Sequence, residues 1–270
     1  MSTFFKSLIF SNVFVAFCAA SLCLSSQLLF GQYNFHITAF IFFATLFTYN
    51  FQRLARTNKH ISHPRISWIA QNRSILFLTA FISGLISSYY FTFFNDKTQG
   101  VIIFCALISL LYPFILRRIP YLKIFFISLI WMISTCLLIV LEQELIFDRE
   151  VFLHSLARFF FVFAITIPFD IRDVKFDNKR LKTIPGLLGI KKSHMIGILS
   201  LVIAQISYLY LFISYNLNVI YLVAISISII ITGLLVIKSN EKKGEMYFSF
   251  GVESTSVIFY IILVISSQMV

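Results

Sequence analysis

The sequence predicts an all-α, polytopic membrane protein, a helical bundle of about nine transmembrane helices. Of its 270 residues, 59% are hydrophobic and only 12% are charged, whereas soluble globular proteins average about 45–50% apolar and 25% charged residues. The apolar residues fall in long runs, and the mean hydropathy is +0.90. A single membrane-embedded domain over residues 1–270 therefore fits better than one or two soluble domains.

Nine apolar segments are candidate helices, since a bilayer crossing takes about 20 mainly apolar residues. The second, fourth and ninth segments are the shortest and could lengthen into the neighbouring loops. The first could instead be a secretory signal, but its apolar run is longer than the roughly 7–15 residues of a signal's apolar core, so we interpret it as a helix. In order, the segments are residues 7–29, 37–51, 75–94, 101–116, 124–141, 152–169, 196–214, 219–237 and 254–269.

The basic residues test this helix count independently, because Lys and Arg accumulate in short cytoplasmic loops. They alternate: Lys6 precedes the first segment, and basic clusters follow the second, fourth, sixth and eighth. The opposite loops hold only Lys97 and Arg149. We therefore expect a multi-pass protein of a prokaryotic cytoplasmic membrane with a cytoplasmic N-terminus. Most of the net charge of +11 then comes from the Lys and Arg residues that set this orientation.

Other classes of function are disfavoured. A basic chain can bind nucleic acid through phosphate contacts, but no basic stretch here is long enough to form a soluble module. The four cysteines all lie in predicted spans without metal-ligand spacing, which argues against disulfides and zinc. The two longest cytoplasmic loops lie four helices apart, which suits a pseudo-repeat of helices one to four and five to eight, followed by helix nine.

Acidic residues concentrate at the end of the sixth segment. If that helix continues past its proline, Asp170, Asp173 and Asp177 occupy positions i, i+3 and i+7 on one face, so that three carboxylates converge. Magnesium is the obvious ion to balance them, since it is typically held by one or two carboxylates together with waters and substrate phosphates. The alternative is a loop beside the membrane whose acids merely neutralise topogenic lysines.

The acidic stretch is part of a longer motif. Asp173-x-x-x-Asp177, followed by Lys182-Thr183-Ile184-Pro185 and Leu188-Gly189, resembles the second aspartate-rich motif of the UbiA family of intramembrane prenyltransferases. Leu111-Tyr112-Pro113-Phe114, followed by Arg117 and Arg118, is similar to its Tyr-Pro segment with a basic pair. Nine helices and two long cytoplasmic loops also match, so the likeness covers nearly the whole chain, and its specific part is the motif after helix six.

The resemblance implies an enzyme that binds an isoprenoid diphosphate through Mg²⁺, ionises it, and transfers the prenyl group to an aromatic or other lipid-soluble acceptor. It assigns Mg²⁺ to Asp173 and Asp177, with Asp170 as a third catalytic residue. Metal and cations would stabilise the departing diphosphate, and the faces of aromatic rings would stabilise a carbocation. The residues expected to contact diphosphate are polar or basic, namely Asn50, Arg53, Tyr112, Arg117, Arg180 and Lys182.

The family's first aspartate-rich motif, Asn-Asp-x-x-Asp-x-x-x-Asp, is degenerate in this chain. The matching stretch, residues 50–58, keeps only the asparagine, so one magnesium site is better supported than two. Arg53 and Arg56 could hold the diphosphate directly, or they could be topology signals. The alternative function is therefore a non-catalytic UbiA-like protein that binds a lipid or a protein partner. An alternating-access carrier is disfavoured because polar residues at mid-membrane are scarce.

Four ionisable residues within or beside predicted spans need separate interpretation. A cation at a helix centre costs about 2.5–3.5 kcal/mol. Glu150, His154 and Arg158 lie at i, i+4 and i+8, which predicts a ladder that snorkels to the outer surface, with a functional cavity as the alternative. We interpret Glu253 as polar packing or helix-start charge, with a position facing the cavity as the alternative.

Overall fold

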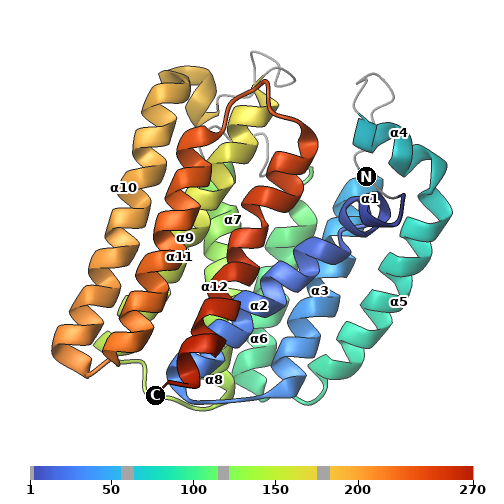
Figure 1. Ribbon diagram of the computed structural model, residues 1–270. Coiled ribbons are helices and arrows are strands. Elements are labelled where there is room, and N and C mark those ends of the chain that lie inside the picture. The colour runs from blue at the N-terminus through green and yellow to red at the C-terminus, as the bar shows by residue number, and fades with distance from the viewer. Residues whose placement is uncertain (1–2, 56–63, 115–121, 175–182, 270) are drawn as a thin grey trace.

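The computed structural model describes residues 3–55, 64–114, 122–174 and 183–269, which form helices without any strand. Long helical segments match all nine predicted spans and pack as one bundle (Figure 1). Seven of them are long and apolar enough to cross a membrane by the criteria of length and composition. The segments are α2 (Val13–Phe30), α3 (Phe35–Ala55), α5 (Arg73–Phe91), α6 (Asp96–Leu111), α7 to α8 (Leu122–Glu142), α9 (Arg149–Asp173), α10 (Ile184–Tyr215), α11 (Val219–Lys238) and α12 (Ser254–Ser267).

The first predicted helix is broken near its start. Asn12 has a left-handed backbone conformation, with φ 64° and ψ 11°, a region that asparagine tolerates better than most residues. The short helix α1 (Thr3–Phe10) is thereby separated from α2 and lies near α4 (Pro64–Gln71) (Figure 1). The membrane span consequently begins at Val13 rather than at residue 7.

The bundle has two chemically different ends. The end of α9, the start of α10 and the connection after α11 lie at one end, whereas the C-terminus and the α10–α11 turn lie at the other (Figure 1). The first end carries Arg53, Lys123, Arg172 and Lys238 close to helix termini and is called the basic end below. The structure thus separates the ends as the charge pattern predicted, and the cytoplasmic assignment of the basic end stays a prediction from that pattern.

Helix α9 lies at the centre of the packing. It contacts α7, α10 and α11, and its Phe161 joins a core cluster with Leu22 of α2, Tyr208 of α10 and Phe259 of α12. Helices in lipid associate through close van der Waals packing, which small residues permit. Gly197 illustrates this, because a Cβ atom added there would lie 2.8 Å from a methyl carbon of Val236.

The Thr-Ile-Pro and Leu-Gly stretch at the start of α10 has a local structural role. The Thr183 hydroxyl caps the helix by accepting a hydrogen bond from the Gly186 amide at 3.3 Å, and proline is tolerated in the first helical turn. Gly189 then breaks the helix with φ 79° and ψ 163°, a conformation open essentially to glycine alone. Part of the family-like motif therefore directs the chain from the basic end into the span.

Substituting Gly189→Ala is expected to destabilise the protein by about 1–3 kcal/mol, because alanine would be strained at this φ and ψ. The unfolding midpoint in detergent can be followed with a thiol-reactive dye, since Cys18, Cys23 and Cys136 are buried in the fold. Gly100→Ala in α6 is the matched control: open space surrounds that position, and alanine favours a helix over glycine by about 1 kcal/mol. Equal losses in both variants would contradict the backbone explanation.

Two of the long segments contain π-helical turns, η2 (Ile133–Leu137) between α7 and α8 and η3 (Tyr247–Val252) before α12. Such turns are rare and occur frequently at functional sites. The second one, η3, packs against α9 and α11 and places the Phe248 ring beside Phe169 and Arg172 at the end of α9.

Candidate functional site

Side chains from several helices lie within electrostatic reach of one another at the basic end, and this set of residues is called the polar ring below. Tyr49 of α3 interacts with Glu253 and Tyr112. Glu253 interacts in turn with Arg172, which is hydrogen-bonded to Asp173, and Lys123 interacts with both Asp173 and Tyr112. The ring therefore joins α3, α6, α7, α9 and the start of α12 around the second aspartate motif.

Arg172 is the most firmly held cation of the polar ring. Its Nε donates to Oδ1 of Asp173 at 2.7 Å, and its Nη1 donates to the two carboxylate oxygens of Glu245 at 3.1 and 3.2 Å. The guanidinium carbon lies 5.3 Å from the Phe169 ring centroid and 5.8 Å from that of Phe248. Ser249 donates to Glu245 at 2.7 Å. Charge-assisted hydrogen bonds and ring contacts thus fix Arg172 and, through it, Asp173.

Asp170 is paired with a lysine from another helix. Lys123 Nζ lies 2.5 Å from Asp170 Oδ1, and the Asp170 side chain is only 3% exposed. The sequence argument that the acids of this helix need a metal to balance them is therefore wrong for Asp170, because an ammonium group already balances it. Asp177 lies outside the described residues. Among the residues that the structure describes, no group of three His, Cys, Asp or Glu side chains could hold a metal ion.

The six residues predicted to contact diphosphate have different outcomes. Tyr112 belongs to the polar ring, and Arg53 lies one turn beyond Tyr49 on α3, within its electrostatic reach. Arg117, Arg180 and Lys182 lie outside the described residues. Asn50 lies apart from the polar ring: it is fully buried, accepts from Asn12 Nδ2 at 2.7 Å, and donates to Thr79 Oγ1 at 3.3 Å.

The buried position of Asn50 has a structural explanation. Its side-chain amide joins the break between α1 and α2 to α3 and α5. A buried polar group without partners costs about 1–3 kcal/mol, so these bonds stabilise the junction. Asn50 is therefore a packing residue in this structure and is not among the diphosphate ligands that we propose below.

The predicted snorkelling of Arg158 is also wrong. Arg158 is 2% exposed, donates from Nη2 to Ser26 Oγ at 3.0 Å, and has its guanidinium carbon 5.3 Å from the Phe259 ring centroid. His154 is equally enclosed, with its ring against Phe30 and Tyr208. The helix face that carries both residues meets α2, α10 and α12 instead of lipid or the outer surface, because α9 lies in the middle of the bundle.

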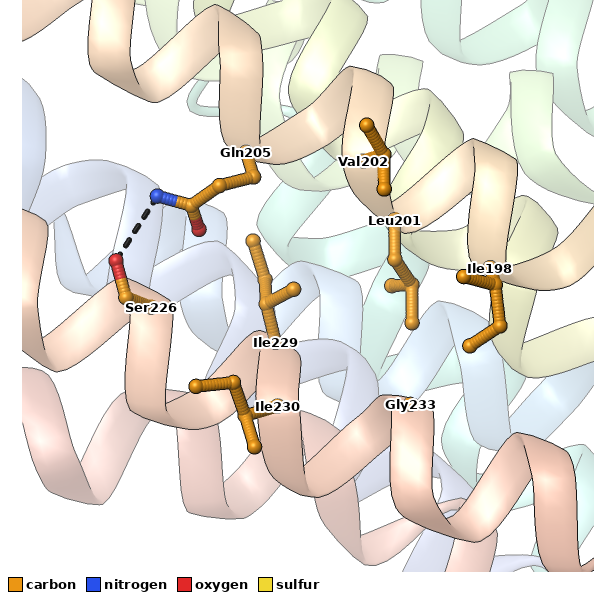
Figure 2. A pocket seen from close by; sticks show the side chains of 8 residues that line it. All are labelled: Ile198, Leu201, Val202, Gln205, Ser226, Ile229, Ile230 and Gly233. Carbon is orange, nitrogen blue, oxygen red and sulfur yellow. Dashed lines mark hydrogen bonds between the residues drawn. The ribbon is translucent and has the colours of Figure 1, made fainter.

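A groove of about 410 Å³ between α10 and α11 lies apart from the polar ring (Figure 2). Its one polar contact is a hydrogen bond of 2.9 Å from Gln205 Nε2 to Ser226 Oγ. No charged side chain lines the groove, so it does not suit a diphosphate. Its lining residues are Ile198, Leu201, Val202, Gln205, Ser226, Ile229, Ile230 and Gly233.

Sequence reasoning missed several members of this site. Lys123 was interpreted only as a topology signal, and Tyr49 and Glu245 were not singled out. Glu253 was interpreted as polar packing or helix-start charge, with a position facing the cavity as the alternative, and it interacts with Tyr49 and Arg172 in the polar ring. For Glu253 one signal was available, because an acidic residue in a membrane span is rare and is by default a candidate for a functional role. Another was the spacing of Glu245 and Ser249, which places them on one helix face.

Solved structures of similar fold cover almost the entire chain. The structure of a UbiA homolog from Archaeoglobus fulgidus bound to GPP and Mg²⁺ has a TM-score of 0.68 at 16% identity, over 97% of this chain and 99% of that one. The apo structure of a UbiA homolog from Aeropyrum pernix K1 has a TM-score of 0.65 at 16% identity, over 98% of both chains. A digeranylgeranylglyceryl phosphate synthase structure has a TM-score of 0.62 at 14% identity, over 98% of this chain and 100% of that one.

These likenesses confirm the predicted arrangement of helices. No protein with a curated description matches the sequence. The model of the UbiA prenyltransferase family matches residues 69–252, a range that runs from α4 to the end of η3 and includes the second aspartate motif. On that match, the chain belongs to the UbiA prenyltransferase family.

Proposed function

We propose that this protein is an integral membrane prenyltransferase that moves a prenyl group from an isoprenoid diphosphate to an aromatic or other lipid-soluble acceptor. The observation that carries the proposal is the placement of Asp173, the first aspartate of the family-like motif, in the polar ring between Arg172 and Lys123. Structures of the Archaeoglobus fulgidus homologue bound to GPP and to DMAPP, each with Mg²⁺, support it.

Asp173 and Asp177 are the residues that we expect to hold magnesium. Carboxylate oxygens are the hard ligands that this ion prefers, and Asp173 fits the role because its side chain is 21% exposed at the end of α9. When bound, the ion would neutralise charge on the diphosphate. Asp170, in contrast, is nearly enclosed, with a side chain that is only 3% exposed, so we assign it no metal.

The chain's own cations and hydroxyls would bind and orient the substrate. In the transfer, the bond between the prenyl carbon and the diphosphate oxygen breaks with its electron pair on oxygen, and the acceptor gains the prenyl carbon and loses a proton. Positive charge fixed beside the leaving oxygen lowers this barrier. We assign that task to Arg53 and Lys182, together with Arg117 and Arg180, and a hydrogen bond to the diphosphate to Tyr112.

The proposed function predicts that prenyl diphosphates stabilise the detergent-solubilised protein. A ligand present at 100 times its Kd stabilises the folded state by about 2.7 kcal/mol, which a thermal scan detects. Geranyl, farnesyl and geranylgeranyl diphosphates are tested with and without Mg²⁺, and the expected result is stabilisation that needs Mg²⁺. Stabilisation without Mg²⁺ would instead indicate that Arg53 and Arg56 hold the diphosphate directly.

The degenerate first motif favours a second candidate function, a non-catalytic member of the family that binds a lipid or a protein partner. Only the asparagine of that motif is kept, and it is buried at a helix junction. Absence of stabilisation by all three diphosphates would contradict the transferase and favour this second candidate.

A further inference from the structure

Lys123 opens α7 and reaches the end of α9 at the acidic motif. Its Nζ contacts Asp170 Oδ1 at 2.5 Å, and its side chain is 17% exposed, compared with 3% for Asp170. The ion pair is therefore asymmetric: the aspartate side chain is enclosed in protein, whereas the lysine side chain is partly exposed. A ligand at the polar ring would meet the lysine before the aspartate.

The backbone around this pair is held by apolar packing. Ile124, the next residue of α7, is 1% exposed and packs with Ile167 and Ile171 of α9. These two isoleucines lie three residues before and one residue after Asp170, so the start of α7 is anchored on both sides of the carboxylate. This packing holds the backbone at Lys123, and the contact with Asp170 holds its Nζ, so that less conformational freedom is lost when a ligand binds.

The ammonium group has hydrogen-bonding capacity beyond Asp170. A lysine carries three N–H donors, and within the described part of the chain Asp170 is the one hydrogen-bond acceptor that Lys123 contacts. Lys123 also interacts electrostatically with Tyr112 and Asp173. Its charge therefore acts on the same space as the proposed magnesium ligand, in a site whose first aspartate motif is degenerate.

We infer that Lys123 binds the diphosphate of the prenyl substrate and that Asp170 positions its ammonium group. This inference rests on the proposed function and adds a diphosphate ligand to it. Lysine is a common phosphate ligand that acts as a point charge. A fixed cation here would supply part of the positive charge that a magnesium ion bound at an intact first motif would supply. Asp170 is then a positioning residue and not a metal ligand.

Four variants separate this role from a purely structural ion pair: Lys123→Met, Lys123→Arg, Asp170→Asn and the double variant Lys123→Met with Asp170→Leu. The measurement is the Kd of geranyl diphosphate with Mg²⁺ in detergent, with the unfolding midpoint recorded in parallel. Geraniol, which lacks the diphosphate, reports on the prenyl pocket alone. The double variant is informative because replacing a buried ion pair by apolar residues is often neutral for stability.

Lys123→Met is expected to weaken geranyl diphosphate binding by about 10- to 100-fold, the loss typical of a charge-assisted hydrogen bond, while geraniol binding is unchanged. Lys123→Arg keeps the cation and should stay within about 10-fold of the wild type, and Asp170→Asn should lose less than Lys123→Met. The double variant should recover the unfolding midpoint and still bind weakly.

Wild-type affinity in Lys123→Met, or in the double variant, would overturn the inference and leave a packing pair. Equal loss in Lys123→Met and Asp170→Asn, with full recovery in the double variant, would do the same. If the wild-type protein binds no prenyl diphosphate, the proposed function fails and this inference fails with it. The two failures are therefore distinguishable from the wild-type measurement.

Discussion

Replacing both Asp173 and Asp177 by asparagine is expected to abolish magnesium-dependent binding of prenyl diphosphates and to lower prenyl transfer by at least about 1,000-fold. Asparagine keeps the size of the side chain but removes the anionic oxygens that magnesium prefers, and losing one preorganised electrostatic contact alone typically costs about 100- to 1,000-fold in rate. Release of pyrophosphate from geranylgeranyl diphosphate, with a screened acceptor, measures the transfer.

Asp148→Asn provides the matched control, because it makes the same chemical change at the opposite end of α9. Asp148 caps the helix by accepting a hydrogen bond from the Val151 amide at 3.0 Å, and asparagine caps a helix about equally well. The control should fold, bind and transfer like the wild type. Unchanged magnesium-dependent binding in the double variant would contradict the metal assignment.

Arg172→Met is expected to destabilise the protein by about 3–5 kcal/mol, the usual cost of removing one partner from a buried ion pair. The substitution leaves Glu245 and Asp173 without their hydrogen bonds to the guanidinium and removes the cation that lies near Phe169 and Phe248. The free energy of unfolding in detergent, followed by cysteine labelling, measures the loss. Arg172→Lys should recover part of it, because lysine keeps the charge but not the forked geometry.

Arg149→Met tests whether the loss is specific to this network. Arg149 lies in the first turn of the same helix, at the opposite end of the bundle, and is exposed. Exposed charges contribute about 0–1 kcal/mol, so the control should unfold like the wild type. A loss below about 1 kcal/mol in Arg172→Met would show that the ion network does not hold the basic end together.

Most of the fold could be predicted from the sequence because lipid imposes a simple rule: a crossing segment satisfies its own backbone and is apolar for about 20 residues. Hydropathy and the alternation of Lys and Arg therefore located all nine segments. The breaks at Asn12 and Gly189 were not predicted, since they depend on backbone angles at single residues and leave hydropathy unchanged. The π-helical turn η3, which supplies Phe248 beside Arg172, was not predicted either.

The site was only partly predictable, for a geometric reason. Asp173 was found because its motif is contiguous in the chain. Lys123 and Glu245 were missed because each acquires its role from a partner on another helix, 47 residues from Asp170 and 73 residues from Arg172 respectively. The burial of Asn50 at a helix junction was not predicted, because a motif match identifies a residue type and not its burial.

The enclosure of Arg158 has a consequence for how the chain is made. Ribosomes synthesise α2 and α9 before α12, so Arg158 enters the bilayer when Ser26 has already been inserted and Phe259 does not yet exist. A cation in mid-span costs about 2.5–3.5 kcal/mol on insertion scales, and until the last helix arrives it has one of these two contacts. Completion of translation therefore completes the burial of the charge, and the final helix acts as the closing step of membrane assembly.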